Sequence, residues 1–136
     1  MLKFSKKTEY GLRAMLYLAQ ANSVVPIQNI SAGEDISHTF LEQIIYELKQ
    51  SGLVISQRGA SGGYALAKSP QEINLGDIVR SLEKEIAVSG CVLEDVFSCP
   101  RHEKCLAKNA WFKIQKELLK SVNNISLQDL LDDKLS

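Results

Sequence analysis

Apolar residues in the first part of the chain recur with the spacing of α-helices. Across residues 5–21 they fall at i, i+3, i+4 and i+7, and Ser5 precedes them as a helix N-cap. Pro26 is suited to the start of a short second helix over residues 27–32, after which Gly33 predicts a turn. The predicted apolar face of the first helix comprises Leu12, Met15, Leu16 and Ala19.

The clearest helical pattern begins after Ser37, a favourable N-cap, and ends before Gly52, a residue typical of helix C-termini. One face of this helix is apolar at each position of the helical series: Leu41, Ile44, Ile45 and Leu48. The opposite face can form hydrogen bonds, and a core does not explain it. Its residues are His38, Thr39, Glu42, Gln43 and Tyr46.

A hairpin and four further segments follow. Residues 53–58 and 64–67 are predicted strands around a glycine-rich turn, with Arg58 at the tip. Asn74 caps a predicted helix, and Asp77 stands at its third position as in a capping box. Residues 86–106 have no period. A long helix is predicted from about residue 107, and Ser126 caps a final turn.

This order of elements is that of a winged helix-turn-helix. We expect a mainly α fold with a small β-hairpin wing and a long C-terminal dimerisation helix. A dimer would bury the apolar surface of that helix and present two recognition helices to a two-fold DNA site. The predicted units are a winged helix-turn-helix DNA-binding domain (1–85), a cysteine loop (86–106), and the dimerisation helix with a C-terminal turn (107–136).

Composition adds little to this pattern. The chain of 136 residues fits a single core, and its net charge is zero. The first 70 residues carry seven basic and five acidic side chains, a mild excess that permits a local DNA-binding face. No apolar run is long enough to span a bilayer, and the first residues do not have the pattern of a secretory signal. The expected location is cytoplasmic, without a membrane partner.

Several polar side chains are suitably placed to contact DNA. Gln43 can pair with adenine, the Thr39 hydroxyl can bond to a base or a phosphate, and Arg58 can reach a phosphate or a narrow minor groove. Lysines at the start of the first helix could attract a phosphate. The alternative is a solvated polar face, but the glycine-rich hairpin that follows favours DNA. The predicted DNA-contact residues are Lys3, Lys6, Lys7, Ser37, His38, Thr39, Gln43, Arg58 and Ser61.

Three cysteines, Cys91, Cys99 and Cys105, are spaced C-x7-C-x5-C. Thiolates suit zinc and iron–sulfur clusters, but the paired knuckles of structural zinc sites are absent. A proline after a ligating cysteine, as in Cys99-Pro100, is also found at cluster sites. Three free thiols or a redox-sensing disulfide remain alternatives. The candidates for a fourth ligand are Glu9, Glu94, Asp95, His102 and Glu103.

Several motifs occur together along the chain: residues 7–14 (KTEYGLRA), 40–43 (FLEQ), 52–54 (GLV), 58–64 (RGASGGY), the three cysteines, and 125–131 (ISLQDLL). Taken together, they resemble the Rrf2 family of bacterial regulators, which includes the IscR, NsrR, RirA and CymR groups, over nearly the whole chain.

The resemblance implies a homodimeric repressor or dual regulator of imperfect palindromic operators, with a 4Fe–4S or 2Fe–2S cluster on the three cysteines. The IscR-like group has a histidine where this chain has Lys108. The NsrR-like group takes a fourth ligand from the partner subunit at the position of Glu9, typically as Asp.

We therefore expect a transcription regulator that senses nitric oxide, iron supply or redox state. The cysteine loop is expected to pack near the recognition helix, so that a change in the cluster alters the separation of the two recognition helices. One alternative is a regulator of the same fold that uses thiols, zinc or a protein partner without a cluster. The resemblance implies that CymR-like members lack the cysteines and sense through a protein partner, which the three cysteines of this chain disfavour. Another is a small iron–sulfur electron-transfer protein. An enzyme is not expected, because no nucleophile–base set or phosphate loop is visible.

Overall fold

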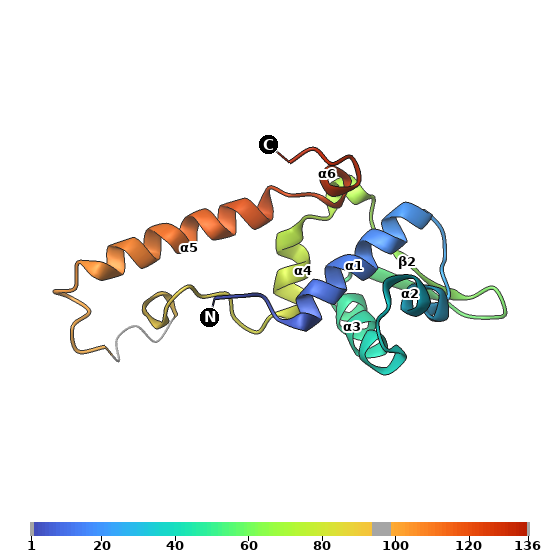
Figure 1. The fold of residues 1–136 in the computed structure, drawn as a ribbon, viewed down its shortest axis with the longest axis horizontal. Helices are drawn as coiled ribbons and strands as arrows, with labels where there is room; N and C mark the ends of the chain where they lie inside the picture. Colours follow the sequence, from blue (N-terminus) through green and yellow to red (C-terminus); the bar gives the residue numbers. More distant parts are fainter. Residues whose placement is uncertain (1, 94–98, 136) are drawn as a thin grey trace.

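The computed structural model describes residues 2–93 and 99–135, which form a helical body with a hairpin and one long projecting helix (Figure 1). The elements follow the order expected of a mainly α protein with a small wing. They are α1 (Lys6–Ala21), α2 (Ile27–Glu34), α3 (His38–Gln50), β1 (Val54–Gln57), β2 (Gly63–Leu66), η1 (Pro70–Glu72), α4 (Leu75–Leu82), η2 (Gly90–Val92), α5 (Ala107–Asn123) and α6 (Leu127–Leu131).

Helix α1 runs through the helical body and contacts α2, α3, α4, α6 and the wing. Ser5 caps it as predicted, accepting a hydrogen bond from the backbone N–H of Thr8 at 3.3 Å. Its buried face differs from the predicted one, because Ala14 and Leu18 are buried while Leu12 and Leu16 lie half-buried at the edge of the core. A helix surrounded on several sides buries a wider face than a four-residue stripe.

Helices α2 and α3 form the helix-turn-helix. Helix α2 continues past the predicted turn at Gly33, which lies against Tyr17: a β-carbon at Gly33 would be 2.5 Å from that ring. Asp35, in the left-handed conformation, ends the helix instead. Ser37 caps α3, and the four apolar residues predicted for its buried face are all fully buried.

The wing is an antiparallel pair in which Val54 lies opposite Leu66 and Gln57 opposite Gly63. A third segment joins it, because Val25 and Tyr64 exchange two backbone hydrogen bonds of 2.8 Å each. Gly63 allows this approach, since a β-carbon there would lie 2.2 Å from the carbonyl oxygen of Val25. The wing is therefore joined to the segment that leads into α2.

The N-terminal ends of α4 and α6 have the same capping arrangement, and contacts between them attach the C-terminal part of the chain to the helical body. Asn74 with Asp77 begins α4, and Ser126 with Asp129 begins α6, each as a complete capping box. Asn74 and Ser126 also pair as an antiparallel bridge, flanked by a hydrogen bond of 2.7 Å from the Leu75 N–H to the Ile125 carbonyl. These bonds fix the chain after α5 onto the winged-helix body.

Helix α5 projects away from the body and is attached near its C-terminal end (Figure 1). Val122 is its one buried residue among those the structure describes. Its predicted apolar stripe is Ala107, Ala110, Trp111, Ile114, Leu118 and Val122, and the first four of these are exposed. Trp111 and Ile114 are 38 and 45% exposed, and Phe112, outside the predicted stripe, is 43% exposed, so most of the apolar surface of α5 is not covered by this chain. None of the described helices has the length and apolar character needed to cross a membrane.

Candidate functional site

The polar face of α3 is open to solvent. Thr39 and Gln43 are exposed, and Tyr46, one turn further along, is 62% exposed. His38 and Glu42 on the same face pair at 2.8 Å between Nε2 and Oε1. Because the other side of the helix is embedded in the core, this face is held outward by rigid packing.

The hydroxyl of Ser37 accepts the Phe40 N–H at 3.3 Å, so this residue fixes the start of α3. Ser37 itself is exposed at the end of the polar face. The helix cap therefore uses the Ser37 hydroxyl oxygen as an acceptor. Contact of Ser37 with DNA remains a prediction.

A groove of about 480 Å³ lies between the wing and the start of α2. Arg58 lines it from the wing, and Lys49 lines it from α3. Arg58 was predicted from the sequence as a DNA contact, whereas Lys49, Gln28 and Gln57 of this groove were not. Lys49 follows Tyr46 by three residues on a helix, and this spacing could have placed it on the exposed face. Ser61 is exposed in the turn of the wing.

The N-terminal end of α1 binds the carboxylate of Glu83, a residue of the same chain. The backbone N–H of Ser5 and the hydroxyl of Thr8 both donate to Oε1 of Glu83, each at 2.7 Å. A phosphate was expected at this helix N-terminus, but a carboxylate already takes the place of the anion at these two donors.

The lysines of this region have different surroundings. Lys7 pairs with Glu47 of α3 at 3.1 Å, and Lys6 pairs with Glu9 at 3.1 Å. The hydrogen bond to Glu9, together with its charge, raises the pKa of Lys6. Lys3 is exposed and lines a separate cavity. Glu9, the predicted fourth ligand, is also exposed to solvent.

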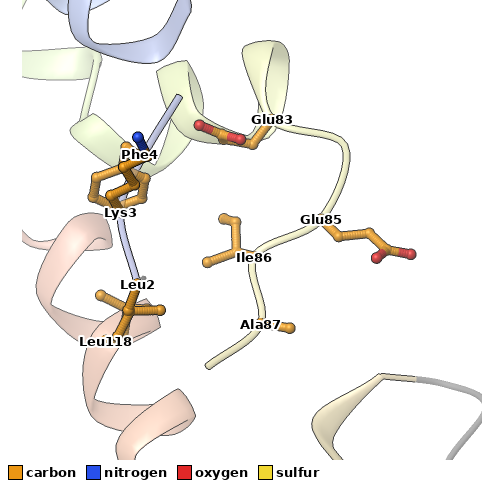
Figure 2. Close-up of a pocket in the computed structure, with 8 residues that line it drawn as sticks. All are labelled: Leu2, Lys3, Phe4, Glu83, Glu85, Ile86, Ala87 and Leu118. Atoms are coloured by element: carbon orange, nitrogen blue, oxygen red, sulfur yellow. The ribbon is translucent and has the colours of Figure 1, made fainter. Parts of the chain in front are cut away.

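That cavity, of about 300 Å³, lies between the N-terminal segment, α5 and the chain after α4 (Figure 2). Leu2, Phe4, Ile86 and Leu118 supply much of its apolar wall. The Glu83 carboxylate lies at one end near the N-terminal segment, whereas the Glu85 side chain points away (Figure 2). No local sequence pattern marks this cavity, because its walls come from three distant parts of the chain.

The three cysteines are free thiols. Cys91 and Cys105 are half-buried and Cys99 is exposed. Within residues 2–93 and 99–135, no group of three or more Cys, His, Asp or Glu side chains is gathered closely enough to hold a metal. The donor chemistry therefore fits a cluster, although the described thiols are not assembled around one centre.

The other candidate ligands in the loop are only partly described. Glu94 and Asp95 lie outside the described residues. The His102 N–H donates to the Cys99 carbonyl at 3.2 Å, and the Lys108 ammonium donates to the His102 carbonyl. The residue at the position of the IscR-like histidine thus ties the loop to the first turn of α5. Glu103 is exposed.

The cysteine loop was expected to pack near the recognition helix, and within one chain this expectation is wrong. The described parts of the loop lie beside the N-terminal end of α5, whereas α3 lies in the helical body (Figure 1). The loop follows α5 because the Gln115 side chain binds the backbone before Cys91. It accepts from the Val88 N–H at 3.0 Å and donates to the Ile86 carbonyl.

Comparisons with known proteins cover almost the whole chain. Residues 4–133 match the family described as Rrf2, iron-dependent transcriptional regulator. The protein rrf2 of Nitratidesulfovibrio vulgaris is 34% identical over 134 residues, which are 97% of this chain and 89% of that protein. CymR (YrzC), the global cysteine regulator of B. subtilis, is a similar solved structure at 34% identity and a TM-score of 0.80, covering 99% of this chain and 100% of that one.

A second solved structure, T. potens IscR, is also 34% identical, with a TM-score of 0.76 over 99% of this chain and 93% of that one. The sequence match and the likeness of fold extend over the helix-turn-helix, the wing, the cysteine loop and α5 alike. The family consists of transcription regulators rather than enzymes. This chain therefore belongs to the Rrf2 family of DNA-binding transcription regulators.

Proposed function

We propose that this protein is a homodimeric transcriptional repressor whose affinity for a two-fold DNA operator depends on an iron–sulfur cluster bound by Cys91, Cys99 and Cys105. The observation that carries the proposal is three free thiols in one loop beside α5. The family's description as iron-dependent supports the choice of metal.

The open surfaces of α3 and the wing support the DNA-binding part. Thr39 and Gln43 would read base edges in the major groove, since their side chains carry the needed donors and acceptors. Arg58 and Lys49, on the groove beside the wing, would neutralise phosphates. The proposed contact surface is completed by Ser37, His38, Ser61, Lys3, Lys6 and Lys7. Lys7 would contact DNA while its ammonium group remains paired with Glu47.

The uncovered apolar face of α5 supports the dimer. Trp111, Phe112 and Ile114 form an exposed patch on a helix that buries only Val122 among the described residues of this chain. Packing against a second copy would remove this patch from water, and two-fold symmetry would pair the recognition helices.

Glu9 of the partner subunit is the proposed fourth ligand. Its carboxylate is exposed in this chain and held by one surface ion pair, which would cost little to break. When bound, the cluster would supply iron that reacts with nitric oxide, responds to iron supply or is oxidised. The three thiolates would hold the loop in one conformation as long as the cluster is present.

The test begins with anaerobic purification, a visible spectrum and an iron and sulfide assay. A brown protein with acid-labile sulfide is expected, and Cys99→Ser should remove the colour. The control Lys104→Ala, in the same loop, should keep it. Binding to a duplex selected by the protein from random DNA should then differ between cluster-loaded and cluster-free protein. Colourless protein after anaerobic reconstitution would overturn the cluster.

The likeness to CymR, which has also been solved from Staphylococcus aureus in a form described as oxidized, favours a second candidate, a regulator of the same fold that responds through its thiols. The exposed thiol of Cys99 supports it, because exposed thiols are open to oxidation. This candidate predicts a colourless protein whose DNA affinity changes with peroxide and is restored by dithiothreitol. A cluster protein would instead lose its colour under peroxide, and reducing the thiols alone would not restore it.

A further inference from the structure

Glu83 occupies the junction between the winged-helix body and the cysteine loop. It is the C-cap residue of α4, and the chain from Glu83 to Gly90, here called the linker, leads directly to Cys91. Its carboxylate does not point into solvent but accepts two short hydrogen bonds from the first turn of α1. The residues involved are separated by more than 70 positions along the chain.

Both donors are poorly placed to find other partners. Thr8 is 3% exposed and is the one buried polar side chain among the described residues. The Ser5 N–H is at the N-cap of α1, where an amide has no partner within the helix. A single carboxylate oxygen satisfies both, in bonds that are stronger for being charge-assisted. The contact therefore holds the start of the linker to the start of α1.

The same turn of α1 is joined to the recognition helix. Lys7 pairs with Glu47 on α3 at 3.1 Å, between two side chains that are largely covered. From α4, the Ser81 hydroxyl donates to the Glu47 carbonyl at 3.2 Å. The first turn of α1 is thus bonded on one side to Glu83 and on the other side to α3, with the helix backbone between the two sets of contacts.

The far end of the linker is held by a different helix. Gln115 of α5 binds the backbone at Ile86 and Val88, and the Ser89 hydroxyl accepts the Cys91 N–H at 3.3 Å. A displacement of the cysteine loop or of α5 would therefore pull on a short linker whose other end is the Glu83 carboxylate. Few residues lie between the two attachments to absorb such a movement.

We propose that Glu83 is a positioning residue that couples the state of the cysteine loop to the orientation of α3, through its bonds to Ser5 and Thr8. This inference rests on the proposed function, since it assumes that cluster and DNA affinity are linked. One state keeps the Glu83 bonds and the other breaks them, which gives the two arrangements that coupling requires. Because Glu9 directly follows Thr8, the same bonds also set the position of the proposed partner ligand.

The experiment measures the ratio of operator Kd values for cluster-free and cluster-loaded protein, using the selected duplex described above. In the wild type this ratio should be about 5 to 150, the usual range of coupling between sites. Glu83→Ala and Thr8→Val should each lower the ratio at least about threefold, with unchanged cluster absorbance per chain. The conservative variants Glu83→Gln and Thr8→Ser keep a hydrogen-bonding atom at each position. Each should therefore retain a larger part of the wild-type Kd ratio than Glu83→Ala or Thr8→Val does. Glu85→Ala, on the same linker but pointing away, is the matched control.

Hydrogen exchange adds a readout that does not depend on DNA. The amides of residues 5–9 should exchange at different rates in the two cluster states of the wild type, and this difference should vanish in Glu83→Ala. A wild-type Kd ratio of one would overturn the proposed function together with this inference. A normal wild-type ratio that Glu83→Ala and Thr8→Val leave unchanged would overturn the inference alone.

Discussion

Gln115 and Val88 are joined by a hydrogen bond of 3.0 Å, in which the side-chain carbonyl of α5 accepts a backbone N–H of the linker. The other half of the same amide donates to Ile86. An extended segment that has no strand neighbour thus has two of its backbone groups satisfied by one side chain.

Replacing this side chain should loosen the linker. Gln115→Ala leaves two half-buried backbone groups without their partner, and we expect the free energy of unfolding to fall by about 1–3 kcal/mol. Urea unfolding measures the loss, and limited proteolysis between residues 83 and 106 should become faster. The control is Gln20→Ala on the exposed side of α1. Its free energy of unfolding should stay within about 0.5 kcal/mol of the wild-type value. Equal effects of the two variants would show that Gln115 does not hold the linker.

The wing prediction concerns salt dependence. Arg58→Ala should weaken binding to duplex DNA and reduce the slope of log K against log salt by about 0.9, the value for one lost phosphate contact. Fluorescence anisotropy at several salt concentrations gives the slope. Lys113→Ala, which removes a positive charge from α5 far from the wing, should leave it unchanged. If Arg58→Ala changes affinity equally at all salt concentrations, Arg58 does not contact a phosphate.

Residues close together in sequence accounted for the most accurate predictions. Ser37 with its four buried partners, and Asn74 with Asp77, are local patterns, and the structure has them as expected. The buried face of α1 was predicted less well, because it is determined by packing against α2, α3, α4, α6 and the wing. The bond between Glu83 and Ser5 spans 78 residues, and no period or motif at either end indicates it.

In the candidate site, too, local sequence patterns predicted some features, while others depend on tertiary packing. The polar face of α3 follows from helical spacing, whereas the place of the cysteine loop depends on where α5 projects and on the side chain of Gln115. Whether three thiols come together depends on the loop conformation, which spacing in the sequence does not determine. The contribution of Lys49 to the groove became visible only once the wing was folded beside it.

Stability should depend on pH through Glu83. Partial burial acts to raise the pKa of this carboxyl, but the hydrogen bonds from Ser5 and Thr8, with the nearby charge of Lys7, lower it overall from 4.5. Its charged form therefore stabilises the fold above about pH 4.5, and this contribution is lost as the pH falls through the lowered value. Glu83→Gln should be less stable than the wild type near neutral pH, and the difference should shrink in acid.

Urea titrations between pH 3 and pH 7 (roughly the span over which carboxylates titrate) test this dependence. The matched control is Glu85→Gln. It removes the same charge only two residues from Glu83, but the Glu85 side chain points away from the start of α1 (Figure 2). A pH-independent difference for Glu83→Gln, or the same curve for both variants, would contradict the prediction.

The apolar patch on α5 predicts the oligomeric state. Trp111→Glu should weaken the proposed dimer by about 2 kcal/mol or more, roughly 30-fold in the dissociation constant, because it would place a charge in an apolar surface that the dimer buries. Sedimentation equilibrium measures this change. Lys113→Glu places the same side chain two residues later, on the side of the helix away from all three patch residues, and should leave the dimer intact. A wild-type monomer at micromolar concentration would contradict the assignment of this patch.

The paired capping boxes of α4 and α6 determine how α5 can move. The bridge between them fastens the chain just after the C-terminal end of α5, so this helix is attached near Asn123, where the Arg80 guanidinium donates to the side-chain oxygen Oδ1 of Asn123 at 2.8 Å. A helix of 17 residues is about 25 Å long, and a tilt of roughly 10° near Asn123 carries its free end through about 4 Å. The cysteine loop sits at that free end. A small rotation near Asn123 would thus appear as a large displacement at the loop, and a change at the proposed cluster site would act on the body that holds α3 through the full length of this helix.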